Sequence, residues 1–241
     1  RAGQWQQALS LLKEMRETRA ETDNIGCSKG ISACTRGGQW QMALSLFSEM
    51  EGAKVEADAF SFNAAISACQ YGRRWQHACF LLSEMRRTSM EADVVCYTYA
   101  IGALGAGGQW QQALCLHREM VRSKVEANSM SYNVAISANH EAGQWQQALR
   151  LLSEMGEGKV ELSAVSYNIA VCTCGNCGQW QQALRLLSVM QESNEQPGAV
   201  GYQAGANACA RELQWLHAVP LLRELDLAKW SRVLRQHERT Q

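Results

Sequence analysis

Proline, surplus charge and long apolar runs are all scarce in this sequence. It contains only two prolines in 241 residues, and because proline breaks helices, this scarcity favours a helical protein. Lys and Arg number 23, as do Asp and Glu, so the formal net charge is zero. Nucleic-acid binders usually carry a basic excess, and the balance counts against that class. No apolar run approaches the roughly 18–20 residues that span a bilayer, so we expect no membrane association.

Hydrophobic residues make up 46% of the chain, enough to form a packed core. Ten cysteines are present, and four of them each precede a tryptophan by six residues. A cysteine that recurs at one repeat position is more simply a buried apolar thiol than half of a disulfide, so we expect reduced cysteines. The four residues are Cys34, Cys69, Cys174 and Cys209.

Tryptophans set a period of 35 residues, which is typical of a repeat array. An alanine follows each of them by three residues, and a methionine, or Leu225 in the last case, follows by ten. Only Trp230 lies outside the series. The periodic residues are Trp5, Trp40, Trp75, Trp110, Trp145, Trp180 and Trp215.

Each period predicts two helices. Trp40, Ala43 and Phe47 share one helix face, and Phe62, Ile66 and Cys69 share a face of the helix before the next Trp. Glycines separate the two helices. One hairpin cannot bury its apolar faces alone, so we expect an all-α fold, a right-handed α-solenoid of stacked helix-turn-helix hairpins. The tryptophans share a stripe with Leu, Phe and Met, which favours packing over the alternative of exposed stacking platforms.

The repeats resemble a known family. Val94–Asn128 and Ala164–Gln182 resemble a V-x-Y-N-x-x-I opening, with Thr98 in place of Asn in the first segment and Val171 in place of Ile in the second, and both have a glycine turn. The first segment also has an A-L-x-L-x-x-x-M second helix, and repeats close on sequences such as K-V-E-A-D. Tetratricopeptide repeats differ, because they have 34 residues and a Trp in the first helix. The chain resembles the pentatricopeptide repeat family, as a P-type array.

On this resemblance residues 1–241 form a single solenoid. Arg1–Asp23 is a partial repeat, Ala199–Val233 is a degenerate terminal repeat without the glycine turn, and residues 234–241 form a tail. Because the chain begins at Arg1 inside the pattern, we expect a fragment, and the lack of a targeting peptide says little about its compartment. The five full repeats are Asn24–Asp58, Ala59–Asp93, Val94–Asn128, Ser129–Ser163 and Ala164–Gly198.

The resemblance implies binding of single-stranded RNA, with one repeat per base. Three residues of each repeat would contact the base, and their positions are counted from the Trp. The first-helix readers, twelve residues before it, are Ser28, Asn63, Thr98, Asn133 and Asn168. The closing readers, eighteen residues after it, are Asp58, Asp93, Asn128 and Ser163, with Gly198 at the fifth position. The base-packing residues, fifteen before it, are Ile25, Phe60, Val95, Met130 and Val165.

The reader pairs imply a base preference. An acceptor-only Asp suits the ring N–H of uracil or guanine, and an Asn amide or Ser hydroxyl suits the ring nitrogen acceptor of adenine or cytosine. The family's rule adds Ser or Thr for purines and Asn for pyrimidines. The array would then prefer 5′-GUAC(Y)-3′, with Asn168 and Gly198 giving only a weak pyrimidine preference.

Two alternatives compete with base recognition. Ser, Thr, Asn and Asp also cap helix N-termini, although capping does not predict the base-packing residues. The chain could also be a protein–protein scaffold without RNA binding, which the neutral charge favours. Where the family often places a basic residue near phosphate, four residues before the Trp, only two of six sites are basic, so we expect weak affinity and a shallow salt slope. These sites are Arg36, Tyr71, Ala106, Glu141, Asn176 and Arg211.

We expect no enzymatic activity and no cofactor. Cys172, Cys174 and Cys177 lack the further ligands of a structural zinc site, so a metal is the weaker interpretation. Cys174 and Cys177 match only the C-x-x-C half of a zinc deaminase signature. The resemblance implies RNA processing, editing, stability or translation in a mitochondrion or chloroplast. We expect a monomer.

Overall fold

The protein is helical throughout the part of the chain that the structure describes. The computed structural model describes residues 5–7, 10, 24–53, 57–88, 90–193, 195–214, 216–221 and 223. Within these ranges there is no strand, which confirms the predicted all-α class. Thirteen-residue helices alternate with short turns: α2 (Asn24–Arg36), α3 (Trp40–Gly52), α4 (Ala59–Tyr71), α5 (Trp75–Arg87), α6 (Val94–Ala106), α7 (Trp110–Arg122), α8 (Ser129–Glu141), α9 (Trp145–Glu157), α10 (Ala164–Asn176), α11 (Trp180–Glu192) and α12 (Ala199–Arg211).

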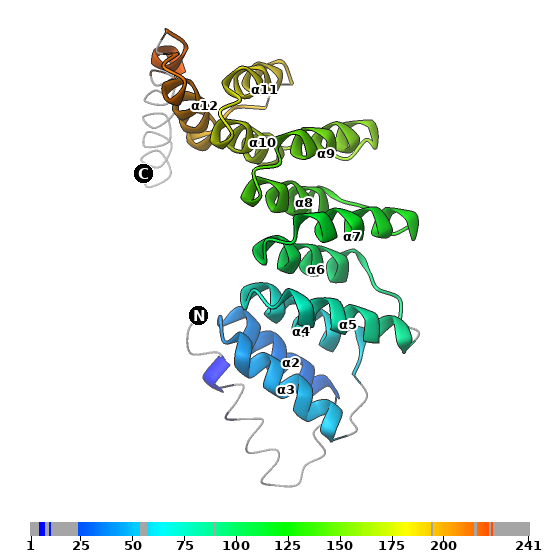
Figure 1. The fold of residues 1–241 in the computed structure, drawn as a ribbon. Helices are drawn as coiled ribbons and strands as arrows, with labels where there is room; N and C mark the ends of the chain where they lie inside the picture. The colour runs from blue at the N-terminus through cyan, green and yellow to red at the C-terminus, as the bar shows by residue number, and fades with distance from the viewer. Residues whose placement is uncertain are drawn as a thin grey trace, which may run out of the picture. The chain divides into compact units, whose positions relative to one another are not determined.

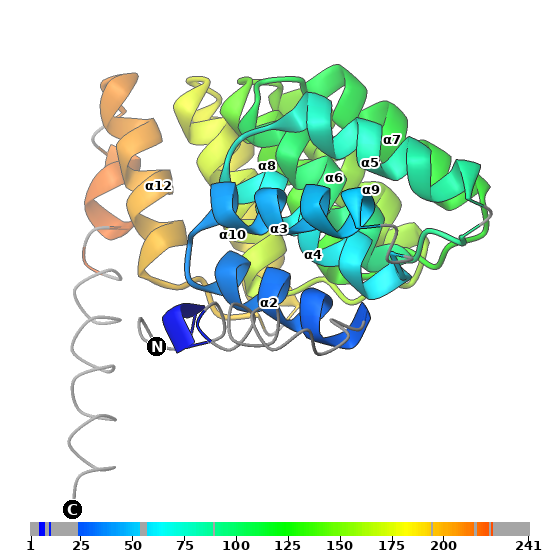
Figure 2. The ribbon, with the colours of Figure 1, turned by 90° about the horizontal axis from the view of Figure 1, so that it is seen from below.

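The helices form two compact units, Arg1–Glu126 and Ala127–Gln241. In the first unit, three hairpins follow one another: α2–α3, α4–α5 and α6–α7 (Figure 1). The first helices α2, α4 and α6 pack successively on one another, whereas each second helix packs on first helices only. Figure 2 shows each second helix of this unit on the same side of its first helix. The first helices therefore form a continuous layer, and the second helices lie side by side upon it.

The second unit repeats this arrangement with α8–α9, α10–α11 and α12. Its first helices α8, α10 and α12 contact one another in turn, and α9 and α11 each contact the first helices beside them. The 35-residue sequence period thus corresponds to one hairpin in both units, as the sequence predicts.

The core consists of the residues that repeat most regularly. The isoleucine in the middle of the first helix and the alanine three residues after the Trp are fully buried. The methionine at the end of the second helix is also buried in each described repeat. Small alanines let the two helices of a hairpin approach closely, and the long side chains fill the space between hairpins. The buried isoleucines are Ile31, Ile66, Ile101 and Ile136, and the buried methionines are Met50, Met85, Met120, Met155 and Met190.

The turn between the helices requires a left-handed backbone conformation at one position. Gly38 and Gly178 have φ angles of 76° and 71°, a region that glycine enters without steric cost. Arg73 and Leu213 occupy the same position in their repeats, with φ angles of 55° and 58°. The turn is therefore kept in the terminal repeat that lacks the glycine, because the packing of the hairpin enforces it.

The tryptophans pack between consecutive hairpins. A Cβ atom added to Gly72 would lie 2.6 Å from the Trp40 ring, and one added to Gly37 would lie 2.6 Å from the Trp5 ring. Each indole is half-buried against the end of the next first helix. The predicted packing role is confirmed at these positions, whereas Trp215 and Trp230 lie outside the described residues.

Several predicted segments also fall outside the described residues. They are most of the partial repeat 1–23, the end of the terminal repeat beyond residue 223, and the tail 234–241. The single solenoid over residues 1–241 stays a prediction. No helix within the described ranges is long and apolar enough to cross a bilayer.

Candidate nucleic-acid interface

The closing readers are helix N-caps. The side chains of Asp58, Asp93 and Asn128 accept hydrogen bonds of 2.8–2.9 Å from the backbone N–H three residues later. Ser163 caps α10 through a longer contact of 3.5 Å, and Gly198 precedes α12 without a side-chain cap. The capping role that the sequence left open is therefore present at four repeats.

Capping leaves the second carboxylate oxygen of Asp58 and of Asp93 available as a hydrogen-bond acceptor. Asp93 uses Oδ1 for the cap, and its Oδ2 lies 3.5 Å from the Nδ2 of Asn63. Asp58 uses Oδ1 for the cap and also holds Ser28 Oγ at 3.5 Å, while its Oδ2 has no hydrogen bond among the described residues. A carboxylate has about four acceptor sites, so capping a helix and accepting a base N–H do not compete. The two predicted pairs Ser28/Asp58 and Asn63/Asp93 are brought together by the fold.

The pairs of the second unit are arranged differently. No hydrogen bond joins Asn133 to Ser163 among the described residues. Asn168 and Gly198 are neighbours, since a Cβ added to Gly198 would lie 3.9 Å from Asn168 Nδ2. Only the first of these pairs has two polar side chains.

The hydroxyl readers are more enclosed than the sequence suggests. Ser28 is 2% exposed and hydrogen-bonds to the backbone carbonyl of Asn24 at 2.6 Å. Thr98 is 8% exposed and donates its proton to the carbonyl of Val94 at 2.6 Å. Ser and Thr commonly bond back to the preceding helical turn, which commits the single hydroxyl proton. These two side chains therefore offer mainly acceptor lone pairs to a ligand.

The asparagine readers are half-buried, with the amide oxygen turned into the protein. Asn63 Oδ1 accepts a hydrogen bond from the thiol of Cys96. The buried Oδ1 atoms of Asn133 and Asn168 have no hydrogen-bond partner in the part of the chain that the structure describes. Asn168 Oδ1 lies above Gly201, where an added Cβ would be only 2.4 Å away.

The base-packing residues are exposed, unlike the core residues of the same helices. They share the second position of the first helices, where burial in the core would be the ordinary state of an apolar residue. Their exposure shows that the described residues leave this face of the first helices uncovered. The exposed fractions are Ile25 58%, Phe60 52%, Val95 40%, Met130 63% and Val165 57%.

A hollow of about 440 Å³ lies on the first-helix face of the first unit. Phe60, Asn63 and Val95 line it together with Arg36 and Tyr99. A predicted first-helix reader, two base-packing residues and one basic residue from the predicted phosphate position therefore converge on one depression.

The second unit has a similar hollow of about 460 Å³. Val200 and Gln203 line it, at the base-packing and first-helix reader positions of the terminal repeat. The sequence prediction omitted both because that repeat was set aside as degenerate, although counting 35 residues from Val165 and Asn168 finds them. His140 also lines this hollow, and its Nδ1 lies 3.1 Å from Thr173 Oγ1.

The two basic side chains at the predicted phosphate positions are exposed. Arg36 donates from Nε to the carbonyl of Ser32 at 3.3 Å, and Arg211 donates to the carbonyl of Asn176 at 3.3 Å. Both bonds run along the protein surface, where a phosphate can replace the carbonyl as a stronger, charged acceptor.

The ten cysteines lie within the described residues, and none of them forms a disulfide there. Cys34, Cys69, Cys174 and Cys209 are 0% exposed, which confirms that they are buried apolar thiols. Burial raises the pKa of Cys69 to about 12, an effect that the nearby Cys79 increases. Among the described residues no group of three His, Cys, Asp or Glu side chains lies close enough together to hold a metal ion.

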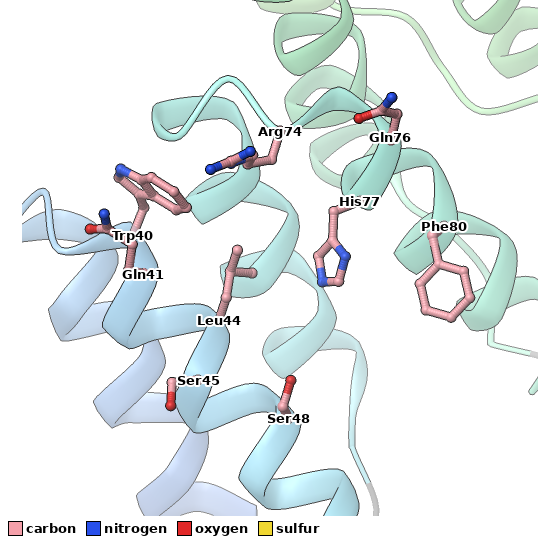
Figure 3. Close-up of a pocket in the computed structure, with 9 residues that line it drawn as sticks. All are labelled: Trp40, Gln41, Leu44, Ser45, Ser48, Arg74, Gln76, His77 and Phe80. Atoms are coloured by element: carbon pink, nitrogen blue, oxygen red, sulfur yellow. The ribbon is translucent and has the colours of Figure 1, made fainter.

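A third hollow, of about 670 Å³, lies on the opposite, second-helix side between α3 and α5. Figure 3 shows the Trp40 ring and the Arg74 guanidinium near each other, and Arg74 Cζ lies 5.1 Å from the ring centroid. His77 and Phe80 extend from α5 beside them, with ring centroids 6.0 Å apart. None of the predicted readers lines this hollow.

Solved structures share this fold. Pentatricopeptide repeat protein PPR10 from maize superposes with a TM-score of 0.63 at 20% identity, over 93% of this chain and 37% of that one. PPR10 in complex with an 18-nt psaJ RNA element gives 0.56 at 15% identity, over 94% and 38%. The PPR domain of Arabidopsis thaliana protein-only RNase P 1, in complex with tRNA, gives 0.59 at 15% identity, over 73% and 95%. The chain thus spans less than two fifths of the PPR10 chain.

Sequence comparison agrees with the fold. No curated protein gives a significant sequence match. The PPR repeat model matches residues 1–18, 31–55, 130–160 and 165–195, and the PPR repeat family model matches residues 92–140. Together these segments span more than half of the chain, at the period that the structure shows as hairpins. The chain belongs to the pentatricopeptide repeat family.

Proposed function

We propose that this chain binds single-stranded RNA along the first-helix face of its hairpins, one base per repeat. One observation carries the proposal. Each full repeat exposes an apolar residue at the start of its first helix, one turn from a half-buried or buried polar reader. A surface that alternates apolar and hydrogen-bonding side chains at a fixed spacing suits unstacked bases, whose faces are apolar and whose edges are polar.

The solved relatives support the proposal. PPR10 is described in complex with an RNA element and the RNase P domain in complex with tRNA. The chain itself would bind as a monomer and would occlude or mark an RNA rather than cleave it. Its proposed setting is RNA processing, editing, stability or translation in a mitochondrion or chloroplast.

The base order follows from the reader pairs. Ser28/Asp58 favours G, Asn63/Asp93 U, Thr98/Asn128 A, and Asn133/Ser163 C, so the proposed target is 5′-GUAC(Y)-3′. Asp58 and Asp93 supply the carboxylate acceptors that the ring N–H of guanine and uracil requires. In the second unit, Val200 and Gln203 would extend the contact by one base.

Filter binding with labelled oligonucleotides tests the proposal. We expect a GUAC-containing strand to bind at least tenfold more tightly than a scrambled strand of equal composition. The slope of affinity against salt should be shallow, because Arg36 and Arg211 are the only basic side chains at the predicted phosphate positions. Equal binding of both strands would contradict base recognition, and failure to bind either at low salt would contradict RNA binding.

A second candidate function is binding of a partner protein at the hollow between α3 and α5. The specific observation is that the repeat Ala59–Asp93 departs there from the other full repeats: Arg74, His77 and Phe80 replace residues that are Gln, Gln or Met, and Ser, Cys or Arg in those repeats. The degenerate terminal repeat has Gln214, His217 and Pro220 at these positions. Phe80 is 53% exposed in this hollow. Loss of RNA binding on changing Phe60, with no loss on changing Phe80, would favour the first candidate.

A further inference from the structure

In α4 and α6, the third residue of the helix contacts both predicted readers of the preceding repeat. In α4 the hydroxyl of Ser61 lies 2.6 Å from Ser28 Oγ and 2.6 Å from Asp58 Oδ1. In α6 the backbone N–H of Cys96 donates to Asp93 Oδ1 at 2.9 Å, and its thiol donates to Asn63 Oδ1. A serine in one repeat and a cysteine in the next therefore make the same pair of connections.

Helix capping and the packing of first helices bring these groups together in α4 and α6. The closing reader caps the helix, and a capping side chain reaches the backbone of the third helical residue. The first helices also pack on one another, which brings that residue against the first-helix reader of the repeat before. Ser61 and Cys96 are both 0% exposed, so their hydrogen-bonding groups can be satisfied only by the protein.

The Cys96 thiol acts as a proton donor at this place. Burial is the main cause that raises the pKa of Cys96 to about 12, and the negative charge of Asp93 adds to it, so the sulfur stays protonated at physiological pH. Met85 Sδ lies 3.5 Å from the sulfur, and the Asp93 carboxylate, which already accepts from the Cys96 backbone N–H, also interacts with the thiol. A thioether is a weak acceptor, and the amide oxygen of Asn63 is a stronger one.

Two neighbours therefore select one orientation of the Asn63 amide. Its oxygen faces the thiol of Cys96, and its Nδ2 faces the Oδ2 of Asp93 at 3.5 Å. The flipped amide would place its oxygen against the carboxylate and its N–H groups against the thiol, and would lose both interactions. Asn63 can then present donors, but not its acceptor, to a base.

We propose that Cys96 is a positioning residue for base selection by the Asn63/Asp93 pair, an inference that rests on the proposed RNA binding. An Asn63 held as a donor suits a uracil carbonyl oxygen, and Asp93 suits the uracil N–H. Cytosine instead offers an amino donor and a ring nitrogen acceptor on its pairing edge. Without the thiol, the amide can turn its oxygen toward the cytosine amino group, and the preference for uracil over cytosine declines.

The second unit provides a contrast within the same chain. Asn133 Oδ1 and Asn168 Oδ1 are buried and find no hydrogen-bond partner among the described residues. Beside Asn168 the third helical residue is Gly201, which has no side chain to donate. The amides of Asn133 and Asn168 lack the restraint that Cys96 gives Asn63. The fourth and fifth bases should accordingly be discriminated less sharply than the second.

The test compares Cys96→Ala, which removes the donor, with Cys96→Ser, which keeps a donor of similar size. Cys69→Ala is the matched control, because Cys69 is also fully buried in the first unit and has no contact with a reader among the described residues. Each protein is titrated with strands carrying U or C at the second base, and separately with strands altered at the first base. Two-dimensional NMR of the RNA-free proteins follows the Asn63 side-chain amide, assigned with Asn63→Asp.

We expect Cys96→Ala to lose at least threefold of the U-over-C preference at the second base. The U-over-C preference of Cys96→Ser and of Cys69→Ala should stay within twofold of the wild-type value. In all three variants the preference at the first base should also stay within twofold of wild type. The Asn63 amide signals should shift in Cys96→Ala and remain in place in Cys69→Ala.

Two results would overturn the inference. One is an unchanged U-over-C ratio in Cys96→Ala, and the other is Asn63 amide signals in that variant that coincide with those of the wild type. The NMR result needs no RNA, so it judges the contact even if the wild-type protein binds no strand. Failure of the wild type to bind RNA would contradict the proposed function itself.

Discussion

The indole of Trp75 lies against the backbone of Gly107, the residue that follows helix α6. A Cβ atom at Gly107 would lie 2.3 Å from Trp75 Cδ1, closer than any real contact. Trp40 and Gly72 repeat this relationship one hairpin earlier. The tryptophan thus packs between consecutive hairpins, and at these two positions a glycine on the next hairpin makes room for the ring.

Gly107→Ala should destabilise the first unit by about 1–3 kcal/mol, because the ring or the helix end must shift to admit the methyl group. Gly52→Ala is the control, since nothing lies within 4 Å of its added Cβ. That change should leave stability unchanged or raise it slightly. Urea unfolding measures both, and equal midpoints for the two variants would contradict the packing argument.

Phe60→Ala should weaken RNA binding by about tenfold, since contact between an aromatic ring and a base contributes about 1–3 kcal/mol. Phe80→Ala is a close match, because the two rings are 52% and 53% exposed but lie on opposite sides of the first unit. Fluorescence anisotropy with a GUAC strand measures the effect. A larger loss in Phe80→Ala would place the ligand on the second-helix side.

Asp93→Asn should move the preferred second base from U toward C. The amide oxygen can still cap Cys96 N–H, and Asn caps helices about as well as Asp, so stability should change little. The amide N–H groups can donate to the ring nitrogen of cytosine, which a carboxylate cannot do.

Competition between U- and C-containing strands measures this change. Asp93→Ala is the control, which should lose the base preference and about 1 kcal/mol of stability together. A variant Asp93→Asn that still prefers uracil would contradict the assigned role of Asp93.

Alkaline pH should destabilise the protein through its buried thiols. The folded protein holds the Cys69 proton to a pKa of about 12 because of burial and the neighbouring Cys79, whereas an unfolded thiol releases it at about 8.5. Above about pH 8.5 the unfolded state therefore binds fewer protons, and stability falls as the pH rises toward 12.

Removing the Cys69 thiol should remove its contribution to the loss of stability with rising pH. Between about pH 8.5 and 10.5, urea unfolding of Cys69→Ala should lose stability less steeply than wild type, by at most about 1.4 kcal/mol per pH unit. Cys115→Ala, which changes an exposed cysteine, should follow the wild type. A Cys69→Ala curve parallel to the wild type would contradict the prediction.

The closing readers show why capping and recognition were hard to separate from the sequence. Polar residues at a helix N-terminus are explained by capping alone, and Asp58 and Asp93 do cap α4 and α6. Only the structure shows that each carboxylate keeps an oxygen beyond the cap. Phe60 and Met130 are apolar residues that capping does not explain, and the structure shows that both are exposed; their role in packing on a base stays a prediction.

The sequence by itself determined the period, the two helices of each repeat and their buried faces, and it gave the positions at which base readers are predicted. These features are local, since helix periodicity, glycine turns and the recurring Trp each depend on residues that are close together in the sequence. The hydrogen bonds that orient the readers were decided by the tertiary structure. Cys96 and Asn63 are 33 residues apart, and Ser61 and Ser28 are equally distant. They meet only because one first helix packs on the next. No local sequence pattern predicts which two side chains are then in contact.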